Sequence, residues 1–215
     1  MSTKEQRLKL FSKIDLYPVI SSEFCNGRPP LYILEQIAEG GARIVQLREK
    51  NLSAKELYSL ALKYREITSK YNMLFIMNDH MDIALAVNAD GVHLGQDDMP
   101  IEATGKIAPD LIIGNSTHSL AEALEAQERG ADYINIGPIY ATQTKSVPCP
   151  PLGIETIENI LPHLKIPFTV MGGIKEKHLP GLIRNGARKI AMVTEITASE
   201  NVKEKVLLLR KYFQS

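Results

Sequence analysis

An α/β fold, a single (β/α)8 barrel, is predicted by eight short apolar runs that alternate along the chain with eight amphipathic segments. The apolar runs are nearly continuous, which is typical of strands that are covered on both faces in a parallel sheet. Glycine–alanine pairs precede three of the runs, at 41–42, 130–131 and 186–187, and they favour a recurring turn from helix to strand. The length of 215 residues fits one such TIM barrel, so we expect a single domain over 1–215.

The expected strands span 16–20, 44–47, 74–77, 91–93, 112–114, 133–136, 168–171 and 189–193. The expected helices span 31–39, 53–70, 81–87, 101–107, 120–129, 154–161, 177–185 and 202–212. Ser53 with Glu56 forms a capping box, and Ser119 precedes Glu122 in the same way. An open doubly wound sheet is the alternative fold, but it usually binds phosphate in its first strand-to-helix turn. Residues 21–27 lack that glycine pattern, which favours the barrel.

Basic and acidic residues balance at 25 each, so neither nucleic acid nor a membrane surface is an expected partner. No window is long and apolar enough to cross a bilayer, and the charged N-terminus lacks the apolar core of a secretory signal. Cys25 and Cys149 lie far apart in the sequence, which favours a reducing compartment over a disulfide framework. We therefore expect a cytoplasmic protein whose partners are small molecules.

Two acidic turns, at 78–82 and 96–98, each follow a run that is expected to be a buried strand. Carboxylates at the C-terminal ends of neighbouring parallel strands can converge on one Mg²⁺, which typically takes one or two carboxylates plus phosphate oxygens. The carboxylates of the two turns, Asp79, Asp82, Asp97 and Asp98, are candidates for such a metal site. An acidic turn can also be only a solvated loop or a helix cap. Either role is open to these carboxylates on the pattern alone.

Gln46 lies near the end of the second expected strand, and Arg48 and Lys50 follow it. Because side chains alternate along a strand, these three point to one side, and Glu49 points to the other. Two cations and an amide at the mouth of a barrel suit a diphosphate. A charged strand edge without a ligand is the alternative interpretation.

Hydroxyl groups and one ammonium follow the fifth and sixth expected strands. Ser116 can donate a hydrogen bond to a phosphate or a leaving group, although a lone serine is usually structural. The loop after the sixth strand carries Thr142, Thr144 and Lys145 and is long enough to act as a lid. It lacks the glycines of a P-loop, which argues against a nucleotide cradle.

Gly172-Gly173 follows the seventh expected strand, and Val193-Thr194 ends the eighth. Backbone N–H groups of the last two loops of a barrel commonly bind phosphate, whereas a tight turn is the competing explanation for a glycine pair. No Ser-His-Asp or Cys-His arrangement stands out, and no lysine is isolated in an apolar setting. These loops therefore favour the joining or rearrangement of two phosphorylated molecules over hydrolysis by a protein nucleophile.

Five motifs stand in order along the chain: Gln46-Leu-Arg48-Glu-Lys50; Asn78-Asp79-x-x-Asp82; the run 89–98; Gly137-Pro-Ile-Tyr140 with Thr142-x-Thr144-Lys145; and Gly172-Gly173-Ile174. Together they resemble the thiamine-phosphate synthase family, and the resemblance covers essentially the whole chain. It implies a Mg²⁺-dependent TIM-barrel transferase. Such an enzyme joins 4-amino-2-methyl-5-pyrimidinylmethyl diphosphate to a thiazole phosphate and releases diphosphate.

The resemblance also implies the roles of the site residues. Asp79 and Asp98 would bind Mg²⁺, which leaves a supporting role in the turns for Asp82 and Asp97. The pyrimidine diphosphate would be held by Gln46, Arg48, Lys50, Asn78, Ser116 and Lys145, of which Arg48, Lys50, Ser116 and Lys145 would serve catalysis. The thiazole phosphate would be held by Thr142, Thr144, Gly173, Val193 and Thr194, where Thr194 stands in place of the serine of the family. The implied mechanism is dissociative, through a pyrimidine cation.

Two relatives on the same barrel remain as alternatives. A thiazole tautomerase-like isomerase would use His118 as its acid/base, but that relative lacks the Asp79/Asp98 pair and the Thr-x-Thr-Lys loop. A non-catalytic regulator would not need intact charged and metal-binding positions. His93, inside an apolar run, is expected to be a hydrogen-bonded core residue.

Overall fold

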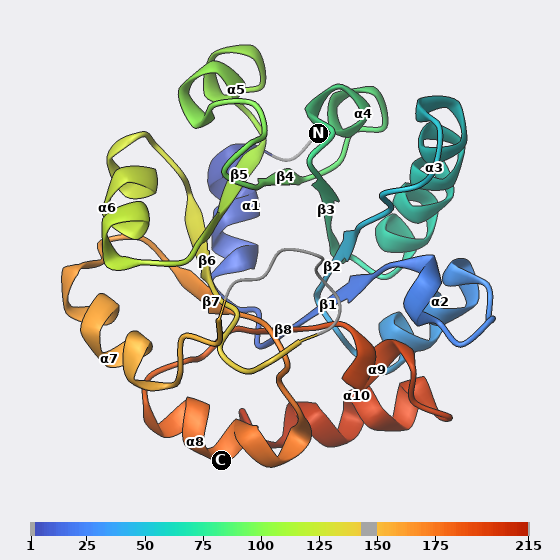
Figure 1. Cartoon of the computed structure of the whole chain (residues 1–215). Coiled ribbons are helices and arrows are strands. Elements are labelled where there is room, and N and C mark those ends of the chain that lie inside the picture. Colours follow the sequence, from blue (N-terminus) through green and yellow to red (C-terminus); the bar gives the residue numbers. More distant parts are fainter. Residues whose placement is uncertain (1–2, 143–149, 215) are drawn as a thin grey trace.

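Eight parallel strands form a closed barrel in the order β1 to β8 in the computed structural model, which describes residues 3–142 and 150–214 (Figure 1). The predicted (β/α)8 barrel is confirmed, with every expected strand present. The strands are β1 (Leu16–Ile20), β2 (Ile44–Leu47), β3 (Leu74–Asn78), β4 (Gly91–Leu94), β5 (Ile112–Thr117), β6 (Tyr133–Ile136), β7 (Phe168–Val170) and β8 (Ile190–Met192).

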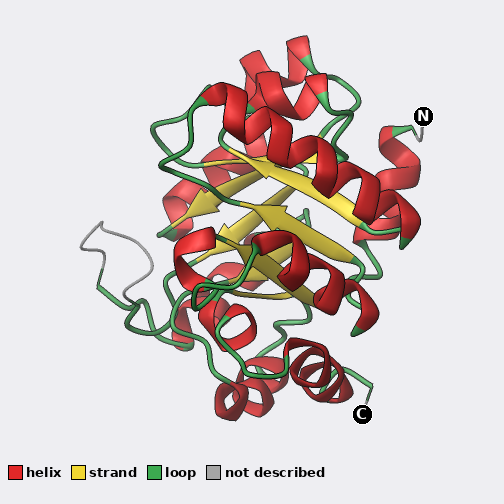
Figure 2. Ribbon diagram, turned by 90° about the vertical axis from the view of Figure 1, so that its right-hand side faces the viewer, coloured by secondary structure: helices red, strands yellow, loops and turns green. Residues whose placement is uncertain are grey.

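The helices surround the strands, as the side view in Figure 2 shows. They are α1 (Lys4–Phe11), α2 (Pro30–Glu39), α3 (Ala54–Lys70), α4 (Met81–Ala86), α5 (Ile101–Ile107), α6 (Leu120–Glu128), α7 (Glu155–Ile160), α8 (Leu179–Arg184), α9 (Thr194–Thr197) and α10 (Val202–Lys211). Short 3-10 turns occupy Ser22–Phe24, Leu161–His163 and Glu176–His178. Among the described residues, none of the helices combines the length and apolar character that crossing a membrane requires.

Helices α1 and α9 lie outside the set that the sequence predicts. The start of α1 is a capping box, in which the Thr3 hydroxyl accepts from the Gln6 backbone N–H and the Gln6 side chain accepts from the Thr3 N–H at 2.9 Å. Helix α1 buries only two of its eight residues, and one of them is the charged Arg7, the other being Phe11. Its sequence therefore shows little of the apolar periodicity that predicts a helix. The four residues of α9 are too short for any periodic signal.

The apolar core has two parts. The larger part fills the space between the outer faces of the strands and the surrounding helices. The smaller part fills the barrel interior and consists of Phe11, Ile14, Tyr17, Val19, Ile44, Leu74, Ile76, Ile112, Tyr133 and Ala191. Phe11 belongs to α1, so this helix closes the end of the barrel at which the strands begin.

Buried charges fasten α1 to that end. The Arg7 guanidinium donates to the Asp110 carbonyl oxygen at 2.6 Å and lies 3.4 Å from an Asp90 carboxylate oxygen. Asp90 also accepts from Arg65 of α3 at 2.8 Å and from the Phe75 backbone N–H at 2.9 Å. Because the Asp90 carboxylate has several hydrogen-bond partners, the free-energy cost of burying its charge is offset. Helix α1 covers this end of the barrel, so a site is expected at the opposite end, where the strands end.

Candidate active site

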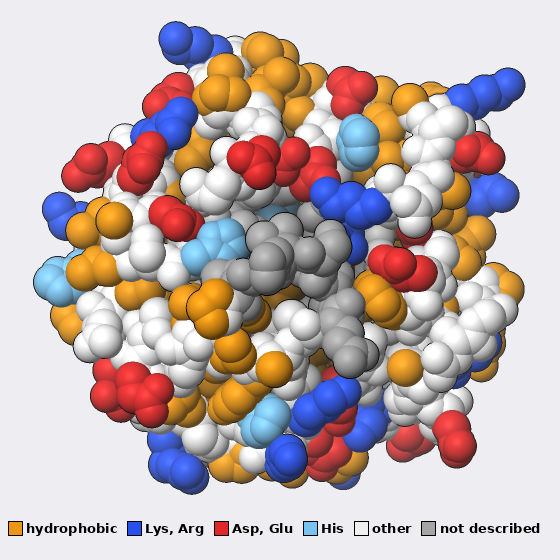
Figure 3. Space-filling view, viewed as in Figure 1, with side chains coloured by type: hydrophobic (Ala, Val, Ile, Leu, Met, Phe, Trp, Pro, Cys, Tyr) orange, Lys and Arg blue, Asp and Glu red, His pale blue; other side chains and the backbone are white. Residues whose placement is uncertain are grey.

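A cavity of about 440 Å³ lies at the C-terminal ends of the strands. Figure 3 views this end of the molecule and shows acidic and basic side chains next to each other near its centre. The described residues that line the cavity are Val19, Ser21, Phe24, Gln46, Arg48, Lys50, Asn78, Asp79, His93, Gly95, Gln96, Asp97, Asp98, Ser116, His118, Pro138, Thr142, Met171 and Val193. Most residues that the sequence singles out are thus brought together, as the barrel predicts.

Asp79 and Asp98 meet in this cavity from the ends of β3 and β4. Asp79 follows the last residue of β3 with a φ of 61°, and its carboxylate forms an ion pair with the Lys50 ammonium. Asp98 turns back on its own loop and accepts from the Gly95 backbone N–H at 2.6 Å. Burial raises the pKa of the Asp98 carboxyl, and the neighbouring Asp79 carboxylate raises that pKa further, whereas Lys50 lowers it.

The two carboxylates fit a hard divalent cation. Both are oxygen donors, and their mutual repulsion is relieved by positive charge between them. Within residues 3–142 and 150–214, no group of three or more His, Cys, Asp or Glu side chains could hold a metal ion. A cation bound by Asp79 and Asp98 would therefore need further oxygen ligands from substrate or water, as Mg²⁺ usually does.

Residues 46–50 adopt the alternation that the sequence predicts. Gln46, Arg48 and Lys50 all line the cavity, and Gln46 is buried. Glu49 points the other way and is buried, where it accepts from the Ser22 backbone N–H at 2.8 Å and from the Ser22 hydroxyl at 2.5 Å. The Ser21 hydroxyl donates to the Arg48 carbonyl oxygen. The loop after β1 is thereby tied to the segment that carries both cations.

Ser116 lies within β5, one strand position before its end, rather than after the strand as the sequence suggests. Its hydroxyl oxygen is 3.0 Å from His93 Nε2. His93 is buried, which agrees with the prediction of a hydrogen-bonded core residue, but its contact with Ser116 also makes it part of the site. Gln96, which the sequence analysis missed, donates to the Ser116 carbonyl oxygen at 2.5 Å and to the Asn115 side-chain oxygen at 3.2 Å.

The expected thiazole-phosphate residues are only partly assembled. Thr142 and Val193 line the cavity, whereas Gly173 and Thr194 do not. Gly173, at a φ of 60°, has no room for a side chain, because a Cβ would lie 2.2 Å from the Ala141 carbonyl oxygen. The glycine pair therefore allows the loops after β6 and β7 to pack closely. The remaining expected residues of this region, Thr144 and Lys145, lie outside the described residues, as does Cys149.

His118 pairs with Glu122 one turn away in the sequence. Its Nδ1 lies 2.9 Å from a Glu122 carboxylate oxygen, and the same oxygen accepts from the His118 backbone N–H at 2.9 Å. Ser119 caps α6 by accepting from the Glu122 N–H at 3.2 Å, as predicted. Glu122 thus holds His118 on the rim of the cavity.

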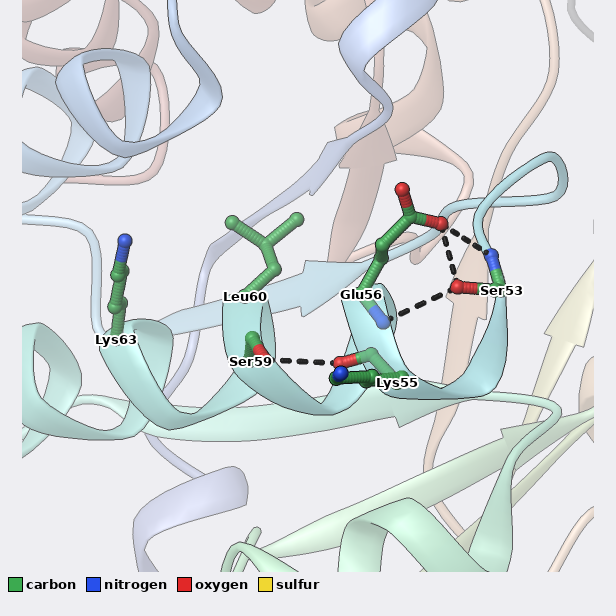
Figure 4. Close-up of a pocket in the computed structure, with 6 residues that line it drawn as sticks. All are labelled: Ser53, Lys55, Glu56, Ser59, Leu60 and Lys63. Carbon is green, nitrogen blue, oxygen red and sulfur yellow. Dashed lines mark hydrogen bonds between the residues drawn. The ribbon is translucent and has the colours of Figure 1, made fainter.

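A second, open depression lies over the first turns of α3 (Figure 4). Its polar groups are those of the predicted capping box: the Ser53 backbone N–H donates to the Glu56 carboxylate at 2.9 Å, and the Glu56 N–H donates back to the Ser53 hydroxyl oxygen at 3.4 Å. Leu60 and Lys63 line its far side. These groups stabilise the helix start, so we assign no chemistry to this depression.

Known proteins resemble this chain over nearly its full length. The family model described as thiamine monophosphate synthase matches residues 16–196. The thiamine-phosphate synthase of Dictyoglomus thermophilum is 43% identical over 203 residues, which are 94% of this chain and 91% of that protein. The corresponding enzyme of Pelotomaculum thermopropionicum is 44% identical over 197 residues, 91% of this chain and 90% of that protein.

A solved structure agrees with these relatives. The thiamine phosphate pyrophosphorylase from Pyrococcus furiosus superposes with a TM-score of 0.86 at 36% identity and covers 97% of this chain and 98% of its own. Sequence and fold thus point to the same transferases, as the resemblance from the motifs predicts. The chain belongs to the thiamine-phosphate synthase family.

Proposed function

We propose that the cavity condenses 4-amino-2-methyl-5-pyrimidinylmethyl diphosphate with a thiazole phosphate, with Mg²⁺ held by Asp79 and Asp98. One observation carries the proposal: the two carboxylates, Arg48 and Lys50 face one cavity at the C-terminal end of the barrel. A site for a diphosphate leaving group needs this combination, because its negative charges must be met both by a divalent cation and by side-chain cations.

In the proposed reaction, the bond between the pyrimidine methylene carbon and the diphosphate oxygen breaks, and its electron pair leaves with the diphosphate. The thiazole nitrogen then forms a new carbon–nitrogen bond with the methylene cation. Arg48 and Lys50 bind the departing charge, Ser116 donates a hydrogen bond to it, and Asn78, the last residue of β3, holds the pyrimidine. Bound Mg²⁺ supplies positive charge to the diphosphate oxygens. Such a reaction relies on electrostatic stabilisation and positioning rather than on a protein base.

The residues around the second substrate are proposed from the same arrangement. Thr142 and Val193 line the cavity, Gly173 lies in the loop after β7, and Thr194 is the first residue of α9, which follows β8. These residues would hold the thiazole phosphate. Lys145 and Thr144 would complete the site from the loop after β6.

A cytoplasmic location and a single domain over residues 1–215 stay predictions.

A two-substrate assay tests the proposal. Purified protein with both phosphorylated substrates and Mg²⁺ should form thiamine phosphate and diphosphate, and chelation of the metal should stop turnover. Asp79→Asn and Asp98→Asn should each lower kcat about a hundredfold or more, which corresponds to ~3 kcal/mol of transition-state stabilisation. Asp82→Asn is the matched control, because Asp82 lies exposed on α4 and should leave the rate unchanged.

Two results would contradict the proposal. One is the absence of product from folded protein with both substrates and Mg²⁺. The other is isomerisation of the thiazole without any pyrimidine, which would favour the tautomerase-like reaction with His118 as its acid/base.

A further inference from the structure

A row of hydrogen-bonded polar side chains crosses the interior of the barrel beneath the cavity. The Gln46 amide nitrogen donates to the Tyr17 hydroxyl at 3.0 Å, and the Tyr17 and Tyr133 hydroxyls are 3.0 Å apart. The Tyr133 hydroxyl lies 2.9 Å from His93 Nδ1, and His93 Nε2 lies 3.0 Å from the Ser116 hydroxyl. None of the five side chains belongs to an exposed residue. The row therefore links two proposed substrate-binding residues, Gln46 and Ser116, through three others.

The Gln46 amide determines the direction of this row. An amide nitrogen only donates, so the Tyr17 oxygen accepts from Gln46. The Tyr133 oxygen lies 3.0 Å away, within reach of the Tyr17 hydrogen, and we assign Tyr17 as the donor of that bond. The Tyr133 hydroxyl then donates to His93 Nδ1. In a neutral imidazole the other nitrogen carries the proton, so His93 Nε2–H donates to the Ser116 oxygen. The Ser116 hydroxyl hydrogen is left to point toward the cavity.

The strand register and the packing hold this row in place. His93 pairs with Gly114 across β4 and β5, and Gly114 pairs with Tyr133 across β5 and β6, so the two rings flank a residue without a side chain. A Cβ at Gly114 would lie 2.1 Å from the Tyr133 ring. From below, the Phe11 ring of α1 packs on the Tyr133 ring with centroids 4.5 Å apart. Burial raises the pKa of both phenols, Tyr17 and Tyr133, so they stay protonated donors.

We propose that Tyr17, Tyr133 and His93 are positioning residues for Ser116. The two tyrosines hold His93 in the Nε2–H tautomer, and His93 thereby orients the Ser116 hydroxyl as a donor to the leaving diphosphate. No proton moves along the row; it only sets the direction of each hydrogen bond. The inference rests on the proposed function, because it assumes that Ser116 contacts the diphosphate. The tautomer of His93, by contrast, is a property of the free protein.

The tautomer is measured in wild-type protein by ¹⁵N NMR of the histidine side chains, with the His93 signals identified by their loss in His93→Gln. We expect a proton on Nε2 and none on Nδ1. A proton on Nδ1 would overturn the proposal whether or not the protein makes thiamine phosphate. Lack of synthase activity together with the Nε2–H tautomer would instead refute only the proposed function, since the row would remain as described.

Tyr133→Phe removes one hydroxyl and keeps the ring that Phe11 packs on. We expect a mixed tautomer of His93 and a kcat lowered about tenfold, the effect of ~1.4 kcal/mol, with the KM for the thiazole phosphate within about twofold of wild type. Tyr64→Phe is the matched control, because Tyr64 is fully buried and its hydroxyl has no hydrogen-bond partner among the described residues. It should change neither the tautomer nor kcat.

Wild-type kcat and an unchanged tautomer in Tyr133→Phe would overturn the proposal. Equal losses in Tyr133→Phe and Tyr64→Phe would do the same, because they would show a general effect of buried tyrosine loss. If Tyr133→Phe does not fold, Tyr17→Phe decides in its place. It breaks the row one position earlier, and the same two readouts apply.

Discussion

Replacing Gly114 with alanine should destabilise the protein and disconnect Tyr133 from His93 at the same time. The added Cβ would lie 2.1 Å from one ring carbon of Tyr133, 2.4 Å from a second, and 2.4 Å from its hydroxyl oxygen. Contacts this short cannot persist, so the ring must turn or β5 and β6 must separate. The ring cannot retreat toward the base of the barrel, because Phe11 packs against it there with ring centroids 4.5 Å apart.

The expected cost follows from two opposing effects. Overpacking one methyl group into a filled core typically costs about 1–3 kcal/mol. A glycine-to-alanine change returns about 0.4–1 kcal/mol by restricting the unfolded chain. The net loss of about 1–2 kcal/mol corresponds to a fall in the melting temperature of roughly 2–8 °C for a chain of this length.

Gly105→Ala is the matched control for this measurement. Gly105 lies within α5, and a Cβ there would make an ordinary contact at 3.7 Å with the Ile113 side chain. Helix propensity then favours alanine by up to about 1 kcal/mol, so Gly105→Ala should melt at or above the wild-type temperature. Calorimetry and urea unfolding of both variants test the reasoning. It is refuted if Gly114→Ala unfolds with the wild-type midpoint and retains the wild-type kcat.

Three further changes have expected outcomes. Phe11→Ala empties a fully buried site and should lower the unfolding free energy by about 3–5 kcal/mol, measured in urea; a loss under about 1 kcal/mol would mean that α1 is not part of the core. In metal-free protein, burial and Asp79 raise the pKa of Asp98, so its ionisation disfavours folding and stability should fall as pH rises through that pKa. Asp98→Asn should abolish this decline and should not lower the urea midpoint of unfolding at neutral pH. A lower midpoint in the variant would show that the ionised Asp98 carboxylate stabilises the folded protein, which contradicts the prediction. Thr104→Val removes a buried hydroxyl that lacks a hydrogen-bond partner among the described residues, so it should raise the melting temperature by a few degrees, and a fall would show a hidden partner.

The fold could be predicted from the sequence because the patterns that indicate its strands and turns are local. Each strand reads as an apolar run, and turn signals such as Gly130 and Gly186, both at positive φ, separate the helices from the strands that follow. Helix α1 escaped because it buries only Arg7 and Phe11 and so carries little apolar periodicity. Its place at the base of the barrel depends on distant partners, Asp90 and the Asp110 carbonyl oxygen, which no local pattern shows.

The sequence predicted the site only where the alternation of side chains along one strand determines which way they point. Gln46, Arg48 and Lys50 follow from that rule, and so does the opposite direction of Glu49. The row through His93 and its neighbours could not be predicted in the same way, because it depends on the register between three strands. A shift of one residue in β5 would move Gly114 out of line and bring a side chain between the two rings.

A buried polar row is difficult to explain by stability alone. Each hydroxyl and ring nitrogen loses water on folding, and its hydrogen bonds only restore what burial removes, whereas apolar side chains of the same size would fill this interior without that cost. The row also fails as a unit, since removing one member leaves its neighbours buried and unpaired. The two ends of the row offer a reason for its presence: Gln46 and Ser116 both line the cavity, and in the proposed reaction their polar groups would each have to point in one direction to meet a charged substrate. On that proposal, a rigid row with one hydrogen-bond direction would supply the orientation before the substrate binds, and this positioning would offset the free energy that the buried polar groups cost in the core.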